Sequence, residues 1–172
     1  MAISKKLEKA INRQINRELW SAYLYMSMAS YLDSIGLEGF GRWMKSQTKE
    51  EMAHAEKLYN HVSERGGRAI MGDLEAPPSE WKSVEDVFEY TYNHEQKVTS
   101  LINNLMELAI EQNDHAAQNM LNWFVKEQVE EEDSVKKILD KLNLVNQTTG
   151  GLYMLDKEMG QRVFTPPQSK EN

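Results

Sequence analysis

The sequence predicts an all-α protein: an up-down-down-up four-helix bundle with a long crossover between the second and third helices and a short C-terminal fifth helix. Three observations support this prediction. Apolar residues recur at spacings of three and four along four long segments, which is the spacing of one helix face. Residues that cap helices stand at the ends of these segments. A long stretch without helical periodicity separates the second segment from the third.

The first two helices are expected to form an antiparallel pair. Ser4 can cap the first helix, which Gly36 ends. The short connection from Gly36 to Glu38 then turns the chain back on itself. The second helix extends to the stop signal at Gly66 and Gly67.

The third and fourth helices have similar signals at their ends. Ser83 opens the third helix, which runs to about Gln112, and Asp114 caps a fourth helix that ends near Leu142. Leu152, Leu155, Met159 and Val163 predict the short fifth helix. Residues 1–165 are expected to form a single domain, and residues 166–172 are expected to be disordered.

The segment from Gly67 to Lys82 determines the topology. It contains Pro77 and Pro78, and a segment of this length can extend over roughly 50 Å. A helix of about 28 residues is roughly 42 Å long, so the segment can travel the length of the bundle. A surface loop without a crossover is the alternative.

Charge and composition exclude several classes of partner. The chain has 172 residues, with 20 basic and 27 acidic side chains, which argues against nucleic acid and anionic membranes as partners. No apolar run reaches the length of a membrane span, and no apolar leader segment is evident. The absence of cysteine excludes disulfides and iron–sulfur clusters. The cytoplasm is the default expectation for localisation.

Each of the four long apolar seams is interrupted near its middle by polar residues that can bind metal. A carboxylate on such a buried face must be paired, protonated or bound to a cation. No seam places Lys or Arg beside these acids, so a metal ion is the simplest neutraliser. The interrupting residues are Glu18 in the first seam, Glu51 and His54 in the second, Glu95 in the third, and Gln128 and Glu131 in the fourth.

The pair Glu51 and His54 has i,i+3 spacing, which places carboxylate and imidazole one turn apart on one helix face. This motif is found in di-iron helix bundles and is weak evidence alone. It gains weight because Glu18 and Glu95 lie at matching heights on other helices. Oxygen ligands with a single imidazole suit iron that must meet dioxygen. A structural polar layer without metal is the alternative.

These segments resemble the non-haem ferritins of prokaryotes, and the resemblance extends from about Ser4 to Phe164. It rests on residues 16–25, 50–55, 94–95 and 127–131. The resemblance implies a ferritin-like fold, a first iron held by Glu18, Glu51 and His54, and a second iron held by Glu51, Glu95 and Glu131 with Gln128 nearby. It also implies a third iron site at Glu50, Glu127, Glu130 and Glu131, and a tyrosine beside the centre at Tyr25. A redox role for Tyr25 and the nearby Trp123 is weighed against core packing.

Related bacterioferritins and rubrerythrins carry a second Glu-x-x-His motif on the last helix, which this chain lacks. This departure favours a looser site through which iron passes. Met52 stands where bacterioferritins have a haem ligand, but haem-free ferritins also carry it, and no haem is expected. The resemblance implies ferroxidase activity with dioxygen or hydrogen peroxide, and iron storage in a shell of 24 subunits. A di-iron enzyme acting on a small molecule and a metal-free interaction module are the alternative functions.

Overall fold

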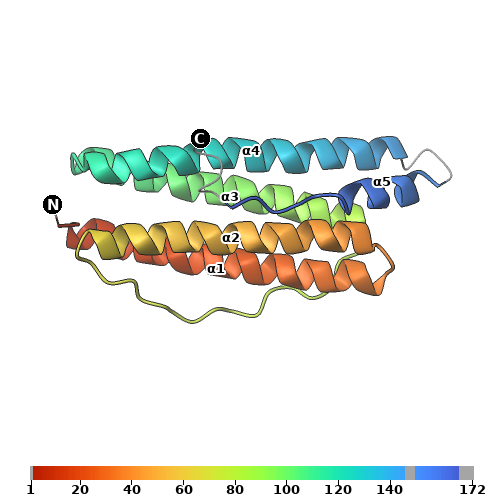
Figure 1. Cartoon of the computed structure of the whole chain (residues 1–172), viewed down its shortest axis with the longest axis horizontal. Coiled ribbons are helices and arrows are strands. Elements are labelled where there is room, and N and C mark those ends of the chain that lie inside the picture. Colours follow the sequence, from red (N-terminus) through yellow and green to blue (C-terminus); the bar gives the residue numbers. More distant parts are fainter. Residues whose placement is uncertain (1, 146–149, 167–172) are drawn as a thin grey trace.

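The computed structural model describes residues 2–145 and 150–166 and is shown in Figure 1. Within these residues all regular structure is helical, which confirms the predicted all-α class. Of the helices in the described residues, the four long ones lie side by side, and the short fifth helix lies at one end of the bundle (Figure 1). Their bounds are α1 Lys5–Ser34, α2 Glu38–Glu64, α3 Val84–Glu111, α4 His115–Val145 and α5 Gly151–Met159.

The order of the helices is up-down-down-up, as predicted. α1 and α2 form one antiparallel pair, and α3 and α4 form the other (Figure 1). The crossover between Glu64 and Val84 runs along the outside of the bundle, so α3 starts at the same end as α2 and runs parallel to it (Figure 1).

The predicted capping residues are found at the helix starts. The side chains of Ser4, Ser83 and Asp114 each accept a hydrogen bond from the backbone N–H three residues further on. Gly36 and Gly66 have φ angles of +82° and +72°, which favour glycine and end the first two helices. Local sequence signals therefore account for most of the helix ends.

The crossover is held against α1 by side chains that share one face of that helix. The side chains of Asn12 and Asn16 each donate one hydrogen bond to the backbone of the crossover and accept one from it, at residues 68–72. The indole N–H of Trp20 donates to the carbonyl of residue 75, and Ser27 donates to that of residue 78. A loop without helical periodicity is thus ordered by hydrogen bonds from a neighbouring helix.

Two apolar clusters fill the bundle. One contains Phe40 and Phe88 and lies toward the α1–α2 turn, and the other contains Leu58 and Leu121 and lies toward the α3–α4 turn. On each long helix the two clusters are separated by the segment that carries the predicted metal-binding residues. The polar layer therefore divides the apolar interior near its middle.

α5 packs against the start of α2. The Asp156 carboxylate accepts a hydrogen bond from the backbone N–H of Phe40 at 3.0 Å, which satisfies one of the open donors of α2. Gly39 allows this contact, because a Cβ there would lie 1.7 Å from the Asp156 carbonyl oxygen. The prediction that Val163 lies on the apolar face of this helix is wrong, because α5 ends at Met159. Val163 is 81% exposed.

The disorder expected for residues 166–172 falls almost wholly on residues 167–172, which lie outside the described residues. None of the helices within the described part of the chain combines the length and apolar character needed to cross a membrane.

Candidate metal centre

The structure brings the six seam-interrupting residues together in the layer between the two apolar clusters. All four long helices contribute, because each seam carries its polar residues near mid-helix. The side chains are buried, with exposed fractions from 1% at Glu18 to 6% at Glu131. The six are Glu18 on α1, Glu51 and His54 on α2, Glu95 on α3, and Gln128 and Glu131 on α4.

Two groups within this layer have the spacing of metal ligands. Glu18, Glu51 and His54 each offer one ligand atom, and these atoms lie within 4.8 Å of one another. His54 forms a second such group with Glu127 and Glu131. The first group contains the three residues expected around the first iron. The second group shares only Glu131 with the set expected around the second iron, and has His54 and Glu127 in place of Glu51 and Glu95.

Glu95 is held by hydrogen bonds from two sides. The Tyr25 hydroxyl donates to one of its carboxylate oxygens, and the Gln128 side-chain amide donates to the other at 3.1 Å. Tyr25 is fully buried, and burial together with the neighbouring acids raises its pKa well above the usual value. These contacts give Tyr25 and Gln128 a part in orienting Glu95.

Two further glutamines orient the other carboxylates, and sequence reasoning missed both. Gln14 donates to Glu18 at 2.8 Å, and Gln47 donates to Glu131 at 2.6 Å and to Glu51 at 3.4 Å. Both are completely buried on apolar seams. An amide on a seam is the available signal, but it is weaker than a carboxylate because an amide carries no charge.

Burial raises the pKa values of the clustered acids. The pKa values of Glu18 and Glu131 rise to about 8, first because of burial and then because of nearby carboxylates. The pKa values of Glu51 and Glu95 are also raised, again mainly by burial. The metal-free cluster is therefore stable in a protonated form, and a cation that binds must displace protons.

The donor atoms fit a metal ion. The second carboxylate oxygen of Glu18 is buried and has no hydrogen-bond partner among the described residues. A buried carboxylate oxygen without a partner is costly unless it is protonated or meets a cation. The available atoms are mostly carboxylate oxygens with one imidazole, a set that suits iron and related divalent ions.

The three residues expected only at the third iron site lie in different environments. Glu127 is buried, with 7% of its surface exposed, and Glu130 is exposed on α4. Glu50 lies one residue before Glu51 and receives a hydrogen bond from Arg162, a residue outside the four apolar seams. Trp123 packs edge-on against the imidazole of His54, with ring centroids 5.5 Å apart.

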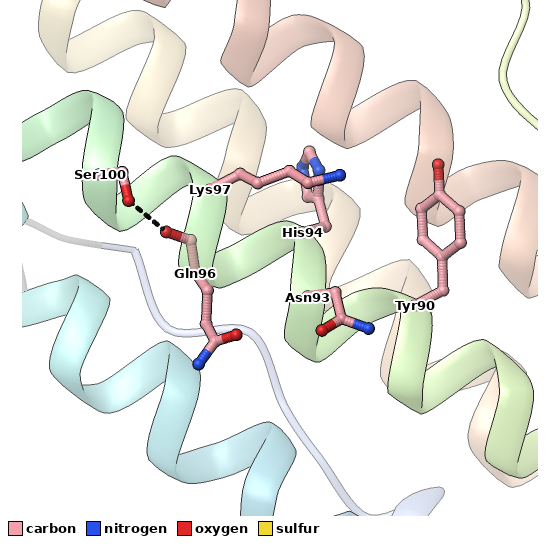
Figure 2. A pocket seen from close by; sticks show the side chains of 6 residues that line it. All are labelled: Tyr90, Asn93, His94, Gln96, Lys97 and Ser100. Atoms are coloured by element: carbon pink, nitrogen blue, oxygen red, sulfur yellow. Dashed lines mark hydrogen bonds between the residues drawn. The ribbon is translucent and has the colours of Figure 1, made fainter.

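A pocket beside α3 is lined by side chains of that helix (Figure 2). His94 is the only one of its lining residues that can readily bind a metal ion, and its Nε2 lies 2.8 Å from the Ser21 hydroxyl. Burial lowers the pKa of His94 to about 4, so the imidazole is neutral near pH 7. No residue of the acid cluster lines this pocket, which is formed by Tyr90, Asn93, His94, Gln96, Lys97 and Ser100.

Comparison with known proteins points to one family. The model of the ferritin-like domain matches residues 8–145. The chain is 40% identical over 160 residues to a bacterial non-heme ferritin of Bacteroides fragilis, which covers 93% of this chain and 99% of the relative. It is 38% identical to one from Staphylococcus aureus over 162 residues, or 94% of this chain and 98% of the relative.

Solved structures give the same result. The fold is similar to that of an open pore ferritin from the archaeon Archaeoglobus fulgidus, with a TM-score of 0.92 and 51% sequence identity. The match covers 94% of this chain and all of the archaeal chain, at 100%. A closed form engineered from the same archaeal ferritin matches with a TM-score of 0.93 and 52% identity, over 95% of this chain and 100% of that one.

Proposed function

Because this chain belongs to the ferritin family of iron-storage proteins, we propose that it oxidises Fe(II) at the buried acid cluster and stores the product as a ferric mineral inside a hollow oligomeric shell. One observation above all supports the chemistry. Acids from four helices converge in a layer that is otherwise apolar, and their pKa values are raised by burial. Such a cluster gains stability when a cation replaces its protons.

Fe(II) is the substrate of this site. We assign one ion to Glu18, Glu51 and His54, and a second ion to Glu51, Glu95 and Glu131 with Gln128 beside it. Each Fe(II) gives up one electron. Two such electrons and two protons convert dioxygen to hydrogen peroxide, which could itself oxidise further Fe(II). Several carboxylates stabilise Fe(III) more than Fe(II), because the attraction grows with the charge of the ion.

The product must leave the site for storage to proceed. Glu127 lies within ligand distance of His54 and Glu131, and the charge of Glu50 acts on Glu131. We assign these two acids, together with Glu130, to a third ion on the way out. A single bundle has a packed interior, so a mineral requires space enclosed between chains. We propose that a shell of 24 copies in the cytoplasm encloses this space. There the released Fe(III) reacts with water, and the water gives up protons as the mineral forms.

Replacing Glu51 tests the site assignment. Glu51→Ala should abolish rapid Fe(II) oxidation in air, measured by stopped-flow absorbance, because we assign Glu51 to both ions. Glu56→Ala is the matched control, since Glu56 is an exposed acid on the same helix. Oxidation by Glu51→Ala at the rate of the unaltered protein would refute the assignment.

A further inference from the structure

Arg162 lies three residues beyond α5, in the segment that turns back beside α2 (Figure 1). Its guanidinium stacks on the indole of Trp43, 4.1 Å from the ring centroid. It also donates to the side-chain oxygen of Gln47 at 2.8 Å and to the carboxylate of Glu50. Trp43, Gln47 and Glu50 follow one another at helical spacing along a single face of α2. This face contacts the planar guanidinium of Arg162 both through an aromatic ring and through hydrogen-bond acceptors.

This contact is sheltered and reaches the acid cluster. The side chains of Arg162 and Glu50 are only 21% and 16% exposed. The negative charge of Glu50 helps to raise the pKa of Glu131, so the two carboxylates are close enough to interact. Arg162 therefore neutralises an acid at the edge of the cluster.

Arg162 also acts on the inner acids through Gln47. Because the Gln47 carbonyl oxygen accepts from Arg162, its NH₂ group is directed to Glu131 and Glu51. The amide thus connects the guanidinium outside the cluster to two carboxylates inside it.

We propose that Arg162 is a tethered cation that competes with a metal ion for Glu50. A guanidinium and a divalent ion on one carboxylate repel each other, so an ion that binds Glu50 favours release of Arg162. The segment after α5 then sets how tightly the outermost ion is held. The Arg162 guanidinium returns to Glu50 when the ion leaves. This inference rests on the third ion of the proposed function.

Metal binding without oxygen tests the competition apart from catalysis. Fe(II) bound per chain would be measured by anaerobic equilibrium dialysis over a range of free Fe(II). Arg162→Gln should tighten the most weakly bound ion roughly tenfold or more, because a charged hydrogen bond no longer has to be broken. Lys141→Gln is the matched control: it removes another cation that links α5 to the bundle, through Glu158, and should leave the affinity unchanged.

A Glu50→Gln variant separates this inference from the proposed function. If Glu50→Gln loses the weakest ion and Arg162→Gln binds that ion no more tightly than the unaltered protein, the competition is wrong and the third ion stands. If Glu50→Gln binds as many ions as the unaltered protein, both the third ion and the competition are wrong.

A second measurement uses the unaltered chain, so it does not depend on whether a variant folds. Phenylglyoxal labelling of Arg162, read by mass spectrometry, should be slow without metal and faster once Fe(II) saturates the protein anaerobically. Labelling that stays the same or slows on Fe(II) addition would overturn the proposal.

Discussion

Replacement of Glu18 by Gln should stabilise the metal-free protein while it weakens the metal site. The Glu18 carboxylate is buried, and one of its oxygens has no hydrogen-bond partner within residues 2–145 and 150–166. A glutamine keeps the oxygen that accepts from Gln14 and places an NH₂ group where the unpartnered oxygen was. An ordinary hydrogen-bond donor therefore replaces a group that must be protonated in the folded protein.

The size of this effect follows from the pKa of Glu18. The pKa is about 8 in the folded protein against 4.5 for a free glutamate. A raised pKa means that the folded state holds the Glu18 proton more tightly, so the contribution of Glu18 to stability is greatest below pH 4.5 and is lost as pH rises toward 8. Each pH unit in this range costs about 1.4 kcal/mol, so the loss reaches about 3 kcal/mol at pH 7. The Glu18→Gln variant does not lose this stability, because its amide does not ionise.

Denaturant unfolding of metal-free protein between pH 4.5 and pH 8 would measure the difference. The two proteins should be nearly equally stable at the acid end, and the variant should lead by about 3 kcal/mol at pH 7. Glu56→Gln, on the exposed face of α2, should follow the unaltered protein at every pH. A Glu18→Gln variant that is less stable at pH 7, or whose advantage does not change with pH, would refute the reasoning.

Three further predictions concern proton release, α5 and the crossover. Anaerobic Fe(II) binding should release more protons per ion at about pH 6 than at about pH 8 in a pH-stat, because the pKa values of Glu18 and Glu131 are about 8; equal release would contradict this. Gly39→Ala should destabilise the protein by about 1–3 kcal/mol and speed hydrogen exchange in α5, because the new Cβ collides with Asp156; unchanged exchange would exclude the collision. Asn16→Ala should cost about 1–3 kcal/mol and speed exchange in residues 68–72, since two hydrogen bonds to the crossover are lost; an equally protected crossover would contradict it.

Most of the fold could be predicted because the helix signals are local. Caps such as Ser4 and Asp114 are used as expected, and the apolar seams face the interior. The prediction of the end of α5 was less accurate. The spacing of Val163 continues the apolar pattern, although the helix has already ended at Met159. Apolar spacing does not reveal where a short helix stops.

The layer of acids was also visible in the sequence, because a charge such as Glu18 or Glu95 stands out on an apolar face. Gln14 and Gln47 were missed because an uncharged amide is a weaker signal there, although one such amide, Gln128, was predicted. Arg162 was missed for a different reason: it reaches Glu50 across 112 residues of sequence, through the packing of α5 on α2. Such a contact depends on tertiary structure and leaves no local pattern.

The most direct test of iron storage is the amount of iron retained per chain after repeated additions of Fe(II) in air, with protein and free iron separated by gel filtration. We predict retention far above the two or three ions that the acid cluster could hold, in a particle much larger than one 19.9 kDa chain. Saturation at about two ions per chain, the occupancy of a bundle site of this kind, would contradict storage and indicate a di-iron enzyme.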